Sequence, residues 1–216
     1  MLGPDAEVSR RDTALSWKAA LDQLPLGCEL GRRGWVHRAM TIRVANSRRD
    51  RHIAADIVKR QHYLGCWPCK PRRLIVSYLA DLGASECAGL VMVVLQPGQY
   101  HVARPLGLKQ YEILSLCRLW RASDLGPAVA PDFTPEMVRR VAHRVRSDWC
   151  ALKLRPGGLR APPRLLVAYA DPEVGHDGGV YLGSGATYCG PGEGGKHLFA
   201  WALDSDLLEP LREFGK

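Results

Sequence analysis

The stretch VAYADPEVGHDGGVYLGSGATYCG, residues 167–190, gathers side chains that could carry out chemistry. An apolar run ends at Asp171, and His176, Asp177 and Tyr181 follow within ten residues. A carboxylate at the end of a strand can accept a proton, bind a metal or orient a base. Pro172 forces a turn, and the glycines around it allow close approach of the backbone to a ligand. A turn that only satisfies its own geometry would use the same residues, but the concentration of reactive groups favours a site.

The pair His62–Tyr63 forms a second candidate, at the end of a helix predicted within residues 51–65. A neutral imidazole binds metals and moves protons near neutral pH. The helix dipole also favours a histidine at a helix C-terminus without any function. Cys66 and Cys69 follow as a single CxxC, but a structural zinc site needs four ligands and the sequence has no second CxxC. His62 with both cysteines is a conceivable ligand set, yet we expect the cysteines to be dispensable buried thiols.

Arg118 stands within YEILSLCRLWRA, which is a strand candidate. Arginine is seldom buried without a partner, so Arg118 either faces solvent or pairs with a carboxylate or phosphate in a cleft. A predicted helix separates this strand from RLLVAYA, so the two strands should be parallel neighbours. Ligands commonly bind at the carboxyl ends of parallel strands, and we therefore expect Asp171 to face a cleft there. The His62–Tyr63 pair should lie at the same cleft, and Tyr181 should line it.

The hydrophobic pattern predicts an α/β fold, with a mixed, partly parallel sheet flanked by helices. Residues 31–216 should form one domain after an N-terminal extension, residues 1–30, which holds a short helix at 13–24. Strands are expected at 36–44, in two runs between 73 and 98, and at 111–122, 164–170 and 197–203. A second long helix should begin with Thr134 as its cap and Pro135 in its first position. Its apolar stripe is Val138, Val141, Val145, Trp149 and Leu152.

Positive charge is concentrated in one segment. The chain has a net charge of +8 at pH 7, and residues 32–73 contain twelve Lys or Arg but only two acidic residues. Dense positive charge is typical of a surface that binds a polyanion, although a solvated basic surface would have the same composition. A second basic group follows in the predicted helix, at Arg139, Arg140, Arg144 and Arg146. We expect contacts to a nucleic-acid backbone, without sequence preference, from Arg48, Arg49, Arg51, Arg72 and Arg73.

The sequence also predicts the compartment. No run approaches the ~20 apolar residues that a membrane span requires, and the N-terminus lacks the layout of a signal peptide. The seven cysteines are an odd number and are scattered, which fits reduced thiols better than a disulfide framework. We expect a cytoplasmic protein without a membrane partner.

Three stretches together resemble the Mom family of phage DNA adenine-modification proteins. They are QHYLG, YEILSLCRLWRA and AYADPEVGHDGGVYLGSGATYCG, in that order. The family pattern combines a His-Tyr pair, a strand of the type E-[IVL]-x-x-[LT]-[CT]-R, and a final block that begins with ADP and contains GHxGxxY. The resemblance spans roughly residues 50–190.

This resemblance implies a GNAT-like fold and a transferase that adds a carbamoylmethyl-type group to N6 of adenine in double-stranded DNA. Such a modification protects phage DNA from restriction in the cytoplasm of the bacterial host. By position, catalytic roles are implied for His62, Tyr63, Asp171 and Tyr181. Binding of substrate or cofactor is implied for Arg118, His176, Gly178 and Gly179. The resemblance also implies an iron centre, with His62 and Asp171 as candidate ligands, and a small-molecule donor, either acetyl-CoA or another acyl or glycyl donor.

One departure and two alternatives stand beside this hypothesis. An ordinary GNAT enzyme holds the pyrophosphate of acetyl-CoA with a glycine-rich loop. Here that segment is WRASDLGPAVAPDFTPEM, with one glycine and three prolines, which weakens the case for coenzyme A. The first alternative is a GNAT acyltransferase that uses acyl-CoA on a small amine or a protein, and it would not need the basic segment. The second is a DNA-binding protein without catalysis, which would have no reason for the reactive residues.

Overall fold

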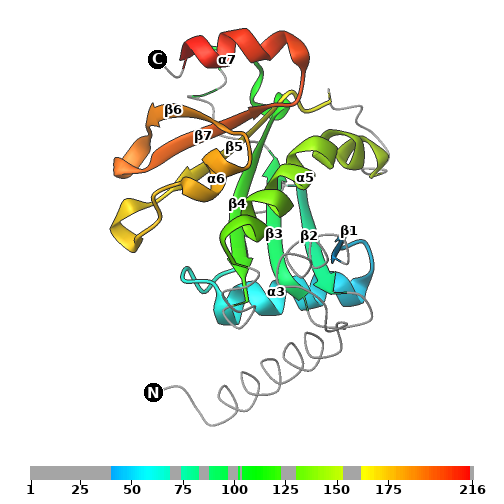
Figure 1. Cartoon of the computed structure of the whole chain (residues 1–216). Helices are drawn as coiled ribbons and strands as arrows, with labels where there is room; N and C mark the ends of the chain where they lie inside the picture. Colours follow the sequence, from blue (N-terminus) through cyan, green and yellow to red (C-terminus); the bar gives the residue numbers. More distant parts are fainter. Residues whose placement is uncertain are drawn as a thin grey trace, which may run out of the picture.

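The computed structural model describes residues 40–68, 74–82, 88–96, 102, 104–122, 130–152 and 162–214. Their strands form one sheet in the order β1-β2-β3-β4-β5-β7-β6, with helices packed on it (Figure 1). The strands are β1 (Met40–Val44), β2 (Leu74–Leu82), β3 (Ala88–Gln96), β4 (Ile113–Arg121), β5 (Leu165–Ala170), β6 (Thr187–Pro191) and β7 (His197–Ala202). The predicted α/β fold with a mixed, partly parallel sheet is confirmed. The N-terminal extension and its helix lie outside the described residues.

Pairing within the described sheet is antiparallel except between β4 and β5. Helix α5 (Ala130–Ala151) connects these two strands, which confirms the predicted crossover. The parallel pairing is short, because it runs only from Ile113 opposite Leu165 to Leu116 opposite Ala168. Beyond this point the two strands diverge, as Figure 1 shows.

A β-bulge in β4 follows directly after the last parallel pair. Val93 of β3 pairs with Arg118, whereas Val94 pairs with Leu116, so Cys117 is an extra residue on β4. Because of this extra residue, Leu116 and Leu119 both pack into the core beneath α5. A bulge re-aims side chains and increases the local twist, and here it does so where the sheet opens.

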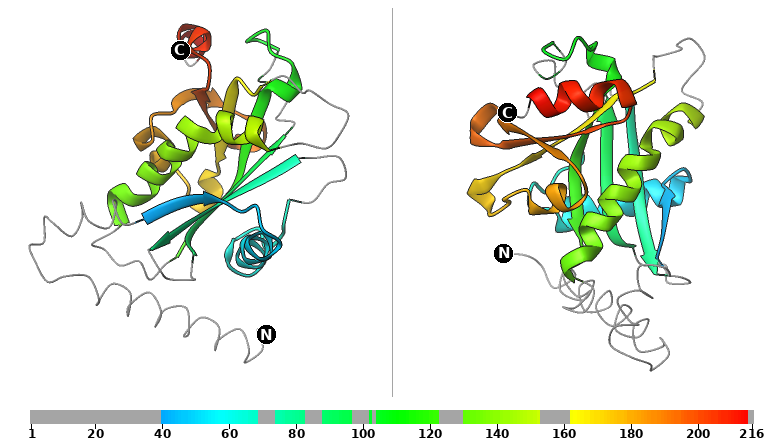
Figure 2. Two further views of the ribbon diagram at one scale, coloured as in Figure 1. Left: turned by 90° about the vertical axis from the view of Figure 1, so that its right-hand side faces the viewer. Right: turned by 45° about the horizontal axis from the view of Figure 1, so that its top comes forward.

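The helices cover the two faces of the sheet unequally (Figure 2). Helix α5 and the short helix α6 (Gly179–Gly183) pack on one face, against alternate residues of the central strands such as Tyr78, Met92 and Leu114. Helix α3 (Arg48–Gln61) packs on the other face, over Leu79 and Val91. Helix α7 (Leu208–Phe214) covers β5 and β7 on that second face. This alternation of buried residues between two faces is what a period of two requires of a strand.

Helix α3 positions the His62–Tyr63 pair. The Ser47 hydroxyl caps its N-terminus by accepting a hydrogen bond from the Asp50 amide at 2.9 Å. Ala54 and Val58, four residues apart, are fully buried against the sheet. The helix ends at Gln61 with His62 as its C-cap, which confirms that the pair follows the helix.

Three elements differ from the sequence predictions. Helix α5 begins at Ala130, so Thr134 is not its cap and Pro135 lies inside the helix. The physical reason is burial: Phe133 is fully buried with the apolar stripe, which makes the additional N-terminal turn favourable. Strand β6 and helix α7 were not predicted, because TYCGP is a short edge strand rich in turn residues. Across the described ranges, no helix has both the length and the apolar character needed to cross a membrane.

Candidate active site

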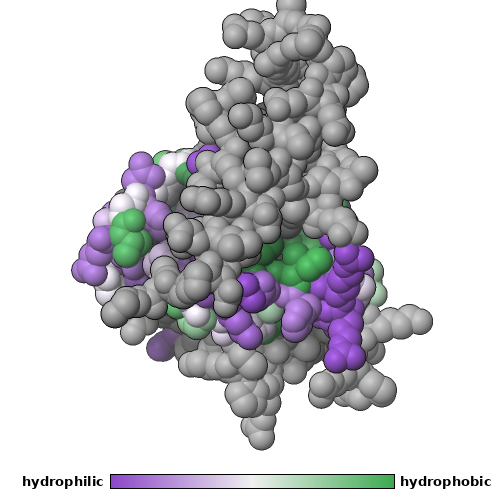
Figure 3. All heavy atoms as spheres, turned by 90° about the horizontal axis from the view of Figure 1, so that it is seen from below, coloured by the Kyte–Doolittle hydropathy of each residue, from purple (hydrophilic) through white to green (hydrophobic). Residues whose placement is uncertain are grey.

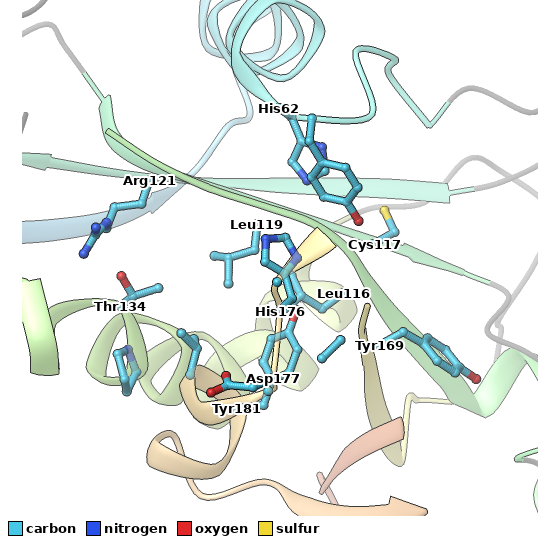
Figure 4. A pocket seen from close by; sticks show the side chains of 16 residues that line it. His62, Leu116, Cys117, Leu119, Arg121, Thr134, Tyr169, His176, Asp177 and Tyr181 are labelled. Atoms are coloured by element: carbon cyan, nitrogen blue, oxygen red, sulfur yellow. The ribbon is translucent and has the colours of Figure 1, made fainter. Parts of the chain in front are cut away.

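The divergence of β4 and β5 opens a cavity of about 430 Å³ (Figure 4). Its walls come from the turn after α3, the second half of β4, the start of α5, the end of β5 and the segment 175–181. The cavity therefore lies where the sequence placed the cleft, at the carboxyl end of β5. Among the predicted site residues, those that line it are His62, Tyr63, His176, Gly178 and Tyr181. Arg118, Asp171 and Gly179 do not belong to this lining.

His62 is buried, with only 8% of its surface exposed. Its Nδ1 atom accepts a hydrogen bond from the backbone amide of Leu64 at 3.1 Å. Burial, the positive charge of Arg118 and the neighbouring His176 together lower the pKa of His62 to about 4. The imidazole is therefore neutral at physiological pH, and its second nitrogen, Nε2, is the one left for a ligand.

Aromatic rings form the mouth of the cavity. Tyr63 is 51% exposed, and its ring stacks on His62 with the ring centroids 4.5 Å apart. His176 meets Tyr63 edge to face at 5.2 Å. Figure 4 shows His62 on one side of the cavity and His176 and Tyr181 on the other. An exposed ring at the edge of a cavity offers a surface on which a planar ligand can stack.

Tyr181 belongs to the wall of the cavity rather than to its mouth. Its ring packs against Phe199 at 5.4 Å and against Trp201 at 5.7 Å. Burial raises the pKa of the Tyr181 hydroxyl well above its ordinary value, so this group stays protonated. Gly178 allows this packing, because a Cβ atom there would lie 2.0 Å from the Phe199 ring. Its φ of +84° also favours glycine.

Asp171 is engaged outside the cavity. Its carboxylate lies 3.0 Å from Nζ of Lys196 and also accepts a hydrogen bond from the Glu173 amide at 3.2 Å. The hydrogen bond from Lys196 is the largest cause of a pKa below the usual range for the Asp171 carboxyl. Asp171 thus follows the end of the strand as predicted. Instead of facing the cavity, its carboxylate caps the turn at 172–174 and forms an ion pair with Lys196.

Arg118 points toward the turn after α3. Its guanidinium donates hydrogen bonds to the carbonyl oxygen of Cys117 at 2.7 Å, to the carbonyl oxygen of Cys66 at 3.3 Å, and to Sγ of Cys66 at 3.3 Å. Of the arrangements that the sequence left open for Arg118, pairing with a protein carboxylate is not among these hydrogen bonds. Because all three acceptors are neutral, the positive charge of Arg118 remains and acts on His62.

Asp177, which the sequence groups with His176 and Tyr181, lines the cavity, and its Oδ1 atom also accepts a hydrogen bond from the Gly179 amide at 2.8 Å. Other cavity residues were not predicted from the sequence. Arg121 and Thr134 line the cavity from the end of β4 and the first turns of α5. Side chains along β4 point alternately to the two faces of the sheet, and this pattern, continued beyond the last parallel pair, could have indicated Arg121 as a lining residue. The bulge shifts the pattern by one residue, so it cannot be read from the sequence.

The basic residues divide into two classes. Arg48, Arg49 and Arg51 lie exposed on the first turns of α3, while Arg72 and Arg73 lie outside the described residues. Figure 3 views this side of the molecule and shows strongly hydrophilic side chains beside apolar ones. The second basic group is engaged in ion pairs: Arg139 and Arg140 share Glu136, Arg144 pairs with Asp148, and Arg146 shares Asp204 with Arg164. That second group therefore does not form an open basic surface.

The iron centre implied by the resemblance requires several free ligands. Within the described ranges, no three His, Cys, Asp or Glu side chains are grouped so that they could hold a metal ion. The two candidate ligands are both engaged: Asp171 with Lys196, and Nδ1 of His62 with Leu64. In this arrangement His62 and Asp171 do not form a ready iron site, and the iron centre implied by the resemblance stays a prediction.

No model of a known protein family matches this chain, and no curated protein matches it significantly. The resemblance to the Mom family is therefore carried by the three motifs, each of which contributes residues to the lining of one cavity.

Proposed function

We propose that this protein is a DNA-modifying transferase that adds a carbamoylmethyl-type group to N6 of adenine in double-stranded DNA. The observation that carries the proposal is the convergence of two distant motifs in one cavity. His62 and Tyr63 come from the end of α3, while His176 and Tyr181 come from the segment after β5, more than a hundred residues later. Neither motif needs the other in order to fold locally. Binding of one shared ligand would explain why both motifs line the same cavity. Protection of phage DNA from restriction is the biological role that this activity would serve.

The open aromatic mouth suits a base taken out of the duplex. An enzyme that acts on a base must extrude it from the stack, because the target atom is inaccessible within the helix. A base has two flat faces, and aromatic side chains bind such faces by stacking. Tyr63 supplies an exposed ring, and it is supported from behind by His62.

Helix α3 links this mouth to a DNA-binding surface. The helix runs from the exposed arginines at its start to His62 at its end. Lys59 is also exposed in its last turn, whereas Arg60 is ion-paired with Asp56 at 2.8 Å. Contacts from Lys59 and from the arginines at the start of the helix to phosphates would hold a duplex beside the cavity without reading its sequence.

Nucleoside mass spectrometry on DNA from cells that express the protein tests the proposal. We expect a modified adenine with the parent chain, and roughly a tenth as much or less with His62→Phe, which keeps an aromatic ring but removes both nitrogen atoms. His143→Ala is the matched control, since His143 is exposed on α5 and lies outside this cavity. Unmodified DNA from cells with a folded parent protein would refute the proposal.

A second candidate function is acyl transfer from acyl-CoA to a small amine or a protein. The observation in its favour is the edge of β4 beyond Leu116, which β5 no longer pairs and which borders the cavity. An extended ligand could bind along such an edge as an added strand would. Calorimetry with acetyl-CoA and with a duplex separates the two: tight acetyl-CoA binding without DNA affinity would favour this candidate.

A further inference from the structure

One nitrogen of the His62 imidazole is hydrogen-bonded within the protein, and the other is available to a ligand. The Leu64 amide donates to Nδ1, so Nδ1 must carry a lone pair. A neutral imidazole with a lone pair on Nδ1 carries its hydrogen on Nε2. The structure thus selects one tautomer through a backbone contact only two residues away, within the turn that follows α3.

The Nε2–H group of this tautomer has no hydrogen-bond acceptor within the described part of the chain. His62 lines the cavity, although 92% of its surface is covered, and its face is occupied by the Tyr63 ring. Nε2 is not among the fully buried polar atoms without a partner in the described residues, so it is reachable from the cavity and can donate to an acceptor on a ligand there.

The charge near His62 indicates which acceptor it would be. The guanidinium of Arg118 is held by two carbonyl oxygens and a thiol, none of which neutralises it. A positive charge beside the ring opposes protonation of His62 and stabilises partial negative charge on a ligand atom. A carbonyl or carboxylate oxygen of the ligand would accept the hydrogen bond from Nε2–H, and its partial negative charge would be stabilised by the positive charge of Arg118.

We infer that His62 is a neutral hydrogen-bond donor, which binds a carbonyl or carboxylate oxygen of the group donor through Nε2–H. This inference rests on the proposed transferase function for the identity of the ligand, but not for the state of the ring. The inference excludes two other roles for His62. A metal ligand or a general base would need a lone pair on Nε2, which this tautomer lacks.

Nitrogen-15 NMR of the ring tests the tautomer directly in the free protein at pH 7. The resonances of His62 are those that disappear in His62→Gln. We expect a bound hydrogen on Nε2 and a lone pair on Nδ1, unchanged when Zn²⁺ is added alone. A hydrogen on Nδ1, a doubly protonated ring, or a Zn²⁺-dependent shift of Nε2 would overturn the inference.

A variant series tests the donor role through nucleoside mass spectrometry. Glutamine places an N–H donor near the position of Nε2 but cannot act as a base at neutral pH, whereas phenylalanine has no donor. We expect His62→Gln, which keeps a donor, to retain most of the modification, and His62→Phe to fall to roughly a tenth of the parent or less, since a buried polar partner left without its hydrogen bond costs about 1 to 3 kcal/mol. Equal loss in both folded variants would overturn the donor role. If the parent itself modifies no DNA, the proposed function fails, while the NMR result still decides the tautomer.

Discussion

The carboxylate of Asp171 lies 3.0 Å from the ammonium group of Lys196, across the turn that leads from β5 to the cavity. The pair lies beside the cavity mouth, because the turn that Asp171 caps leads directly to Gly175 and His176, which line the cavity. Asp171 is thus placed to position a cation at the mouth rather than to react within the cavity.

If Asp171 acts through Lys196, its removal and the removal of the lysine should have the same effect. Asp171→Asn preserves the cap on the turn, because asparagine accepts the same backbone hydrogen bond, but it breaks the ion pair. We expect Asp171→Asn and Lys196→Met to reduce DNA modification by similar factors, and the double variant to be no worse than either. Nucleoside mass spectrometry with a double-mutant cycle measures this coupling. Complete loss with Asp171→Asn alone would instead return Asp171 to a direct catalytic role.

The start of α3 should bind DNA through charge alone. Replacing Arg48 and Arg51 with glutamine should weaken binding to all duplexes alike. It should also flatten the dependence of log K on log salt by about 0.9 per lost phosphate contact. Fluorescence anisotropy over a series of salt concentrations measures both effects. Arg212→Gln on α7 is the control, because Arg212 is exposed and already paired with Glu209. A loss confined to one DNA sequence would contradict backbone binding.

Gly178 should tolerate substitution much less than Gly185. A Cβ atom at Gly178 would collide with Phe199, whereas one at Gly185 has open space, and both residues have a positive φ. We expect Gly185→Ala to lower the free energy of unfolding by about 1 kcal/mol through backbone strain alone. Gly178→Ala should lower it by about 3 kcal/mol, since the ring must also shift. Urea denaturation measures both, and equal losses would show that Phe199 moves away freely.

The pKa of His62 makes stability depend on pH in a defined window. It is about 4 in the folded chain, against an ordinary value of 6.5. The unfolded state therefore binds the proton first as pH falls, so this stability is fully present above pH 6.5 and is lost progressively toward pH 4. At pH 5 the loss amounts to about 2 kcal/mol. Urea denaturation of the parent and of His62→Gln at pH 7 and pH 5 should show this extra loss only in the parent.

The cysteine pair should be dispensable. Cys66 is exposed, and its sulfur only accepts one long hydrogen bond from Arg118, while Cys69 lies outside the described residues. We expect replacement of both cysteines by serine to leave DNA modification within a few-fold of the parent. Abolished modification in a folded double variant, or zinc lost with the two thiols, would assign them a role.

The sequence by itself determined most of the described elements and the location of the cavity. Periodicity placed α3, the stripe of α5 and every described strand except β6, because a period of two or 3.6 residues is a local property of the chain. The crossover between β4 and β5 required those strands to be parallel, and their carboxyl ends indicated where a cavity would lie.

Tertiary structure alone decided which groups are open to a ligand. Arg118 meets Cys66 from 52 residues away, Asp171 meets Lys196, and Arg146 meets Asp204. The bulge at Cys117 and the early end of the parallel pairing set the opening between β4 and β5. Such partners depend on how distant segments pack, and a charge or a lone pair is available for chemistry only when no neighbour has already satisfied it. Residue type therefore identified both His62 and Asp171 as candidate site residues. In the folded chain, the Nε2–H group of His62 remains available to a ligand, whereas the carboxylate of Asp171 is paired with Lys196.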